Sequence, residues 1–252
     1  MEENDQPRAI HFQPGTYDKV LELLPQDRSA RILDVGAGEG YLCRRLKDLG
    51  YNHVEACDAL EKTFKCPDVP FTKVDLNQSI PLPDNRYDCV VSIEVIEHLE
   101  NHFQFMREMV RVTRPGGLIV VTTPNVLSLP SRWHFFAYGY TDCAPFPLDP
   151  TRDEYYMQHL NPISLPELLF HFERCGAELV ALHTNRIRRS SWLPMVFLYP
   201  LLAIVIRLRF LRRKYARFHG LYQRHIRWVL HPANLMGRIT IAVGRKQVVR
   251  PT

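Results

Sequence analysis

Three side chains that can move protons or bind a cation directly follow the apolar run of residues 87–93. They are Glu94, Glu97 and His98, in the pattern Glu-x-x-Glu-His. Carboxylates and imidazoles can deprotonate a hydroxyl group, and together they can ligate a divalent cation. If the segment is helical, the three share one face. The first helical turn also favours acidic residues through its dipole, without any catalytic role, so the pattern leaves three interpretations open.

A glycine-rich segment supplies a second set of candidates. Residues 33–40 read Leu-Asp-Val-Gly-Ala-Gly-Glu-Gly, between a predicted strand and a predicted helix, where glycines let the backbone turn tightly and approach a ligand. Asp58 follows Gly40 by 18 residues and ends the next predicted strand, where a carboxylate can accept both hydroxyls of a ribose. Asp75 ends the third predicted strand and is placed to reach an adenine amino group. The last glycine comes too early for the fingerprint of a dinucleotide site.

The segment after the fifth predicted strand offers a third set. A histidine there, His159, lies in the sequence His-Leu-Asn-Pro and is our candidate for a catalytic base. A metal at Glu94, Glu97 and His98 would need His159 or His134 to complete its coordination shell. Because so few ligands are local, we expect no metal, and we expect a chelator to leave activity largely intact. Several aromatic side chains could stack on an acceptor or cover the protein's own core: Trp133, Phe135, Phe136, Tyr138 and Tyr140.

The elements that must position these residues alternate between strand and helix along the first half of the chain. This alternation favours an α/β fold with a parallel sheet. We expect a turn over 114–117 and irregular structure over 125–160. The strands are predicted at 31–35, 53–57, 71–74, 87–93, 118–122, 177–183 and 239–243. The helices are predicted at 16–24, 41–49, 94–112 and 164–175.

Length and charge indicate how many domains the chain has and where its charges lie. The 252 residues fit a single domain, 1–252, with a large insertion over 185–236 between the sixth and seventh strands. All 27 acidic residues precede residue 179, whereas 15 of the 32 Lys and Arg residues lie after residue 178. This separation of charge suggests an anionic partner for the basic part.

The insertion contains an apolar stretch between arginine clusters. Residues 192–206 carry no charge but are shorter than the roughly 20 residues of a transmembrane helix, and Pro194 and Pro200 are expected to interrupt a helix there. Because basic residues flank this stretch, we expect 185–217 to lie on an anionic membrane surface. The alternative is a helical cap whose arginines pair with the acidic body.

The cysteines and the N-terminal residues indicate in which cellular compartment the protein lies. The six cysteines form no Cys-x-x-Cys pair, which favours reduced thiols. Residues 1–7 are acidic and lack an apolar signal segment. We therefore expect a cytoplasmic protein that binds peripherally to the cytoplasmic face of the membrane.

Several of these motifs together resemble the class I S-adenosylmethionine (SAM) dependent methyltransferases, especially the branch of the ubiquinone-type O-methyltransferases. The resemblance runs over about residues 30–183 and rests on 34–40, Asp58, Asp75 with Leu76, and 114–117. It implies a Rossmann-like sheet of seven strands, mostly parallel, with helices on both faces and an antiparallel last strand. It also implies SAM as the cofactor. The cofactor-binding residues are then Asp34, Gly36, Ala37, Gly38, Gly40, Asp58, Asp75, Leu76, Ile93 and Glu94.

The acceptor side carries a further resemblance. Residues 123–129 with the later His-x-Asn-Pro resemble methyltransferases found among bacterial envelope-polysaccharide enzymes. We therefore expect methylation of a hydroxyl on a lipid-linked sugar, polysaccharide precursor or isoprenoid-type molecule at a membrane face, with His159, Glu97 and His98 as catalytic residues. Glu-x-x-Glu-His is also similar to the metal site of small-RNA 2′-O-methyltransferases, so a methyltransferase whose basic tail binds RNA phosphates is one alternative. A catalytically silent SAM-fold interaction protein is another.

Overall fold

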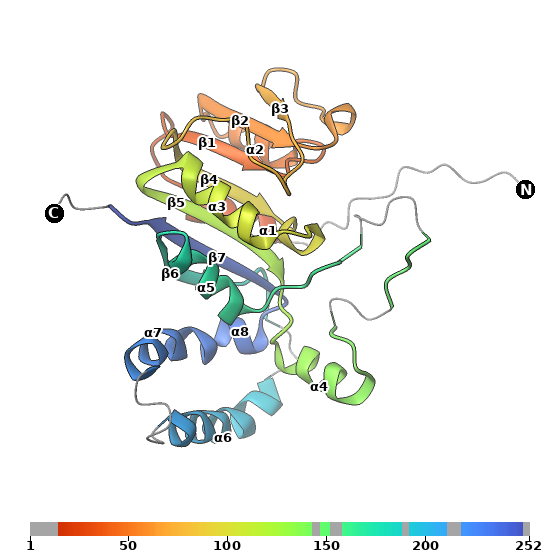
Figure 1. The fold of residues 1–252 in the computed structure, drawn as a ribbon, viewed down its shortest axis with the longest axis vertical. Helices are drawn as coiled ribbons and strands as arrows, with labels where there is room; N and C mark the ends of the chain where they lie inside the picture. The colour runs from red at the N-terminus through yellow and green to blue at the C-terminus, as the bar shows by residue number, and fades with distance from the viewer. Residues whose placement is uncertain (1–14, 143–146, 152–157, 188–191, 211–217, 249–252) are drawn as a thin grey trace, which may run out of the picture.

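The computed structural model describes residues 15–142, 147–151, 158–187, 192–210 and 218–248. Their strands form one sheet in the order β3-β2-β1-β4-β5-β7-β6 (Figure 1). Strand β7 is antiparallel to β5 and β6, and the other pairings are parallel. This arrangement confirms the predicted fold class. The strands are β1 (Arg31–Val35), β2 (His53–Asp58), β3 (Phe71–Lys73), β4 (Tyr87–Ile93), β5 (Thr113–Pro124), β6 (Ala177–His183) and β7 (Ile239–Lys246).

Helices cover both faces of the sheet. On one face, α1 and α2 bury Val20, Leu42 and Leu46 against the strands, and on the other face α3 and α5 bury Phe105 and Phe172. Fully burying a side chain of this size stabilises the fold by roughly 1.5–3 kcal/mol. The helices are α1 (Thr16–Leu23), α2 (Tyr41–Asp48), α3 (His102–Val112), α4 (Leu129–Tyr138), α5 (Leu165–Arg174), α6 (Trp192–Phe210), α7 (His219–Val229) and α8 (Pro232–Met236), with the 3-10 turns η1 (Glu61–Thr63) and η2 (Ile96–His98).

The predicted helix over 94–112 is wrong in its first half. Glu94 has a φ of 54°, in the left-handed region, so the chain leaves β4 in a turn rather than in a helix. The backbone N–H of Glu94 donates to Oγ1 of Thr122 at 3.0 Å, which fixes this turn. Helix α3 begins only after Asn101, whose side chain accepts from the backbone of Gln104 at 3.0 Å as an N-cap. Glu94, Glu97 and His98 therefore do not share a helical face.

Other predicted boundaries also change. The predicted turn over 114–117 lies inside β5, where the pairing with β4 shifts register and Gly116 has a φ of 79°. The predicted irregular region 125–160 contains α4, which begins at Ser128, an N-cap that accepts from the backbone N–H of Ser131. Helix α6 continues through Pro200, so this proline removes a backbone donor without ending the helix.

The insertion lies between β6 and β7 and contains α6, α7 and α8. Its attachment point is Asn125, at the end of β5, whose side-chain nitrogen lies 2.8 Å from the backbone oxygen of Asn234 and 3.0 Å from that of Gly237. Of the basic flanks predicted to meet a membrane, residues 188–191 and 211–217 lie outside the described residues. Among the described helices, none is long and apolar enough to cross a bilayer.

Candidate active site

The glycine-rich turn after β1 is held against the end of β2. One carboxylate oxygen of Asp58 accepts from the backbone N–H of Gly38 at 2.9 Å, and the other accepts from that of Leu60 at 2.9 Å. The N–H of Gly36 donates to the backbone oxygen of Cys57 at 2.8 Å. The turn and the predicted ribose-binding carboxylate therefore form one hydrogen-bonded unit at the carboxyl ends of the parallel strands, where such sheets bind ligands.

Two glycines of this turn have different roles. Gly36 has a φ of 79°, and a Cβ added there would lie 2.3 Å from Cγ2 of Val95. This glycine lets the cofactor turn touch the loop that follows β4. Gly38 has a φ of 52°, and no atom lies within 4 Å of an added Cβ, so its Cα faces the open side of the turn. Gly40, with a φ of 83°, precedes the first residue of α2.

The other predicted cofactor residues also lie along this edge. The carboxylate of Asp75 accepts from the backbone N–H of Asn77 at 2.9 Å just after β3, and its side chain is exposed. Leu76 and Ile93 are buried, and Ala37 packs against the core on the α1–α2 face. All three therefore belong to the apolar packing of the protein at this edge.

A buried carboxyl, Asp34, and a half-buried one, Glu94, lie deeper in the site. Burial raises the pKa of Asp34 to about 7, and its carboxylate accepts from Sγ of Cys43 at 3.3 Å. Burial likewise raises the pKa of Glu94 to about 7, although Oγ1 of Thr122 donates to its carboxylate at 2.8 Å. Both carboxyls therefore hold a proton more readily than an exposed carboxylate does.

Sequence reasoning missed Tyr17, in the first turn of α1. Burial raises the pKa of its hydroxyl, and the carboxyls of Asp34 and Glu94 raise it further, so Tyr17 faces both groups. Its ring packs edge-on against Tyr41, with centroids 4.7 Å apart. The only sequence signal was an aromatic residue in a helix that precedes β1, which is a common core position. Tyr17 therefore lies beside Tyr41, the residue that directly follows the glycine-rich turn.

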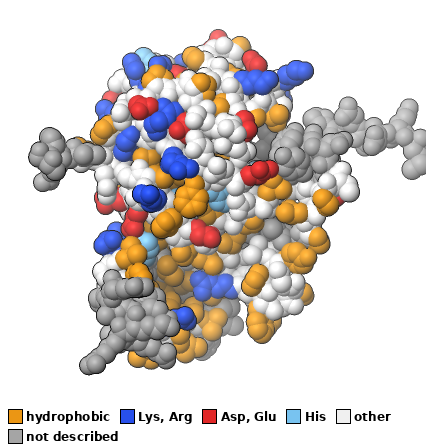
Figure 2. Space-filling view, viewed as in Figure 1, with side chains coloured by type: hydrophobic (Ala, Val, Ile, Leu, Met, Phe, Trp, Pro, Cys, Tyr) orange, Lys and Arg blue, Asp and Glu red, His pale blue; other side chains and the backbone are white. Residues whose placement is uncertain are grey.

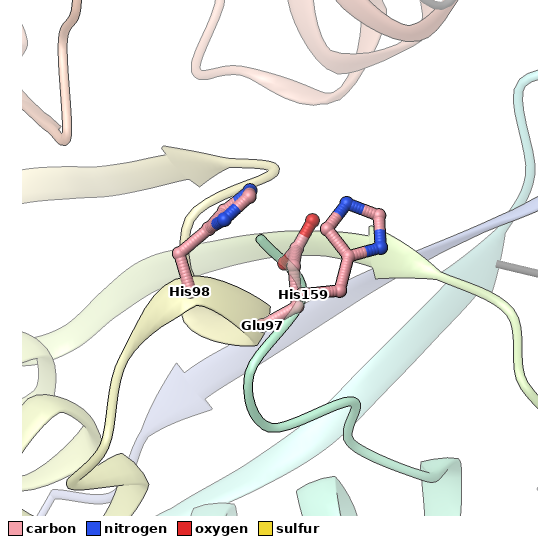
Figure 3. Close-up of side chains that lie close together, drawn as sticks. All are labelled: Glu97, His98 and His159. Carbon is pink, nitrogen blue, oxygen red and sulfur yellow. The ribbon is translucent and has the colours of Figure 1, made fainter. Parts of the chain in front are cut away.

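Glu97, His98 and His159 lie together, and Figure 3 shows their side chains extending into the same space. Their possible ligand atoms all lie within 4.8 Å of one another. Nδ1 of His98 is 2.9 Å from the backbone oxygen of Gln158, and the N–H of Asn161 donates to the backbone oxygen of Glu97 at 3.0 Å. These two contacts fix the segment that carries His159 against η2.

The carboxyl of Glu97 is the most deeply buried group of this cluster, with 1% of its surface exposed. Among the described residues, neither of its oxygens has a hydrogen-bond partner. Burial raises the pKa of Glu97 well above its usual range, and Glu94 adds to this rise. The hydroxyl of Thr123 is near enough to favour the carboxylate slightly, but it lies outside hydrogen-bonding geometry. Such a site favours either a proton on Glu97 or a bound cation.

The structure separates the other proposed metal ligands from this cluster. His134 lies 3.4 Å from the carboxylate of Asp142, and its ring packs against Tyr138. Glu94 points to Thr122 and is not part of the group that could share an ion. Of the two histidines considered from the sequence, the structure therefore brings His159, and not His134, to Glu97 and His98.

Comparison with known proteins identifies the family of the chain. A family model described as a methyltransferase domain matches residues 7–182, more than half of the chain. The chain belongs to this methyltransferase family. The predicted class I SAM-dependent methyltransferase is thereby confirmed at the level of the family, together with the enzyme class and SAM as the cofactor of that family.

Individual relatives of this methyltransferase cover only part of its length. A "Probable S-adenosylmethionine-dependent methyltransferase" of Mycolicibacterium smegmatis is 34% identical over 153 residues, which are 59% of this chain and 52% of the relative. A "Ubiquinone biosynthesis O-methyltransferase" of Rickettsia conorii is 36% identical over 131 residues, 49% of this chain and 44% of the relative. The matches thus span about half the length of these curated relatives.

A solved structure shows the same fold. The S-adenosylmethionine-dependent methyltransferase of Mesorhizobium loti superimposes with a TM-score of 0.55 at 16% identity, covering 91% of this chain and 96% of that chain. At this identity the likeness concerns the fold alone, and the acceptor has to be argued from the site.

Proposed function

We propose that this methyltransferase transfers the methyl group of SAM to a hydroxyl of a lipid-linked sugar, a polysaccharide precursor or an isoprenoid-type molecule. The observation that carries this proposal is the cluster of Glu97, His98 and His159. It stands beside the cofactor turn, because Val95 of the same loop packs on Gly36. A proton acceptor next to a bound sulfonium suits an acceptor that must lose a proton, as a hydroxyl does.

The reaction is an in-line displacement at the methyl carbon. When bound, SAM would supply a methyl group whose bond to sulfur breaks as the acceptor oxygen bonds to the carbon, with the neutral thioether as the second product. Without a cation the hydroxyl proton passes to the cluster, with His159 as the base. With a cation bound, His159 would be a ligand, and the lowered pKa of the acceptor hydroxyl would let it lose its proton before the methyl group is transferred. Asp58 holds the ribose, and Tyr17 and Asp34 line the buried part of the cofactor space. The main contribution of the chain is to align the acceptor behind the methyl group with water excluded.

The same cluster fits a divalent cation. Glu97 offers two buried oxygens without a partner among the described residues, and a ring nitrogen of each histidine lies within 4.8 Å of the other possible ligand atoms. A cation held there would lower the pKa of the acceptor hydroxyl. The sequence-based expectation of no metal assumed that the third local ligand was Glu94 and that any further one was remote. The placement of His159 supplies the missing histidine, and we therefore propose that activity depends on a divalent ion.

The acceptor class can be tested by labelling. The full chain is incubated with methyl-tritiated SAM and three fractions of a cell extract, namely lipids, RNA and water-soluble small molecules. Label in the lipid fraction supports the proposal. Salt-sensitive label in the RNA fraction would instead support an RNA 2′-O-methyltransferase. Bound SAM without label in any fraction would point to a silent interaction protein.

The cation can be tested in the same assay. Treatment with EDTA should abolish labelling, and added Mg²⁺ or Mn²⁺ should restore it. If labelling persists at its full rate in EDTA, activity does not depend on a divalent ion. The proposed role of the cluster in proton transfer would then stand alone.

A further inference from the structure

Helix α6 presents apolar side chains on both of its sides. With about 3.6 residues per turn, Leu202, Ala203 and Ile206 fall on one side, where they are buried or half-buried. The opposite side is exposed and equally apolar. Its members are Leu198, Leu201, Ile204, Val205 and Leu208. A helix that only caps the protein would carry polar residues on this outer side.

Two arginines border the exposed apolar side of α6. On the helical wheel, Arg207 falls at one margin of the stripe and Arg209 at the other. Both are exposed, and among the described residues neither pairs with a carboxylate. Helix α7 differs, because its His225 lies 2.9 Å from the carboxylate of Glu173 on α5. Arg224 and His225 of α7 thus contact α5, whereas Arg207 and Arg209 of α6 are exposed.

Helix α4 adds aromatic side chains to the same end of the molecule. The exposed fractions are 64% for Trp133, 60% for Phe135, 81% for Phe136 and 70% for Tyr138. These residues do not cover the protein's own core, as one sequence interpretation supposed. Neither α4 nor α6 contains an acidic residue.

Both helices contact α8, and Figure 1 shows α4 and α6 together at the end of the molecule beyond α8. Figure 2 shows hydrophobic side chains gathered over this end. Because Asn125 ties α8 to the carboxyl end of β5, the surface adjoins the edge of the sheet that carries the active site. We call the exposed residues of α4 and α6 the α4–α6 surface: Trp133, Phe135, Phe136, Tyr138, Leu198, Leu201, Ile204, Val205 and Leu208.

We propose that the α4–α6 surface docks the protein on an anionic lipid bilayer, with the active-site edge facing the membrane. Exposed Trp, Phe and Leu side chains bordered by exposed arginines suit the headgroup region, where apolar groups enter the acyl boundary and arginines meet lipid phosphates. The inference rests on the proposed lipid-borne acceptor, which the enzyme would then methylate without extracting it fully from the bilayer.

A second copy of the chain fits this surface less well. A symmetric dimer would place the same patch on both sides of the interface. Arg207 and Arg209 would then face the same arginines, and neither α4 nor α6 has an acidic residue to pair with them. An anionic membrane offers the complementary charge along the whole border.

The experiment is co-sedimentation of the full chain with vesicles. Vesicles of phosphatidylcholine with phosphatidylglycerol should pellet the wild type, whereas pure phosphatidylcholine or high salt should leave most of it in the supernatant. Ile204→Glu and Phe136→Ser should each weaken binding about tenfold or more, because they put polar groups into the docked face. The double variant Arg207→Gln/Arg209→Gln should lose the preference for the anionic lipid.

Leu49→Glu is the matched control, because Leu49 is an exposed leucine at the end of α2, remote from this surface. It should bind vesicles as the wild type does, and circular dichroism should show all variants folded. A wild type that stays in the supernatant with anionic vesicles at low salt overturns the proposal. Equal binding by Ile204→Glu and wild type overturns it as well. A dimer in sedimentation velocity that Ile204→Glu dissociates would assign the surface to a second copy.

The outcome is separable from that of the proposed function. Labelling of a detergent-solubilised lipid extract requires no bilayer. If the extract is labelled but vesicles are not bound, only the docking surface fails. If vesicles are bound but no lipid is labelled, the docking stands and the acceptor class fails.

Discussion

The cofactor turn (residues 33–40, with Asp58) and the acceptor cluster (Glu97, His98 and His159) lie at neighbouring strand ends. They differ in how far their polar groups are already hydrogen-bonded within the protein. In the cofactor turn, both oxygens of Asp58 accept hydrogen bonds from the backbone, one from Gly38 and one from Leu60. This part of the site has its shape before any ligand binds. Preorganisation of this kind reduces the ordering cost of binding.

The acceptor cluster contains buried polar groups that lack such hydrogen bonds. Both oxygens of Glu97 and the hydroxyl of Thr123 are buried without a hydrogen-bond partner among the described residues. A buried polar group without a partner costs about 1–3 kcal/mol, which a protein retains where a ligand will supply the partner. On the function proposed above, the cofactor half is complete in the free chain, and the acceptor half would be completed by an ion and a substrate.

Of the variants that test this difference, Glu97→Gln should have the largest effect. Loss of the carboxylate should lower the rate of lipid labelling by about 10²–10⁴-fold, the range for a positioned proton-transfer group. The affinity for SAM, measured by calorimetry, should stay unchanged. Because the pKa of Glu97 is already well above its usual range, a neutral amide should not destabilise the fold.

The control for this variant is Glu100→Gln, an exposed neighbour in the same loop. It should label lipids at the wild-type rate. A Glu97→Gln protein that loses SAM binding as much as turnover would place Glu97 in the cofactor half and contradict the division.

The contact between the two halves can be tested at Gly36. Gly36→Ala adds a methyl group 2.3 Å from Val95, whereas Gly50→Ala, at a similar φ of 85°, meets nothing within 4 Å. Both variants carry the strain of a left-handed residue, so their difference isolates the contact. We expect Gly36→Ala to lower the free energy of unfolding by about 1–3 kcal/mol more than Gly50→Ala does. Urea unfolding measures both values.

A second substitution sharpens this test. Val95→Ala in the Gly36→Ala background should recover part of the lost stability, because it removes the atoms that the new methyl group meets. Equal destabilisation by Gly36→Ala and Gly50→Ala would show that the two loops do not press on each other.

Removal of the ribose-binding carboxylate should have a smaller effect. Charge-assisted hydrogen bonds are worth about 1.5–3 kcal/mol, so Asp58→Ala should weaken SAM binding by about 10–100-fold in calorimetry. Turnover at saturating SAM should change little. Asp58→Asn, which keeps an oxygen for the N–H of Gly38 or Leu60, separates loss of the turn from loss of charge. Equal affinity in wild type and both variants would remove Asp58 from the site.

The smallest effect concerns pH. With its pKa raised to about 7, Asp34 is protonated below neutral pH in the free protein. The cationic cofactor favours the carboxylate, so SAM binding releases a proton and becomes tighter as pH rises through about 7, by up to about tenfold. Calorimetry at about pH 6 and pH 8 measures this. In Asp34→Asn the only pH dependence of SAM affinity that remains should be that of SAM's own ionisable groups. If this variant has the same pH profile as the wild type, Asp34 is not the group that titrates.

The cofactor half could be predicted from the sequence because its determinants are local. The turn over 33–40 and the carboxylate of Asp58 follow from strand ends and glycines that lie close together in the chain, and the structure places them in contact. The same reasoning placed the sheet strands to within a few residues, except for the long β5. Tyr17 was not predicted, because its position depends on how α1 packs beside the turn and no sequence pattern marks it.

The acceptor half depends on contacts between distant segments. Glu94 adopts a left-handed conformation through its bonds to Thr122, which no local propensity of the sequence Glu-Val-Ile-Glu-His indicates. His159 reaches Glu97 because Gln158 and Asn161 bond to η2 across some sixty residues of chain. Sequence reasoning could name His159 as one of two candidates, and only the fold decides between it and His134.

The most direct test of the division between the two halves is the binding of Mn²⁺ to the full chain without SAM or acceptor, measured by isothermal titration calorimetry. We predict one ion per wild-type chain, lost in Glu97→Gln and in His159→Ala and retained in Asp58→Ala and His134→Ala. Binding that is absent from the wild type, or that survives in Glu97→Gln, would contradict this prediction, because the acceptor cluster would then not be the place that a cation completes.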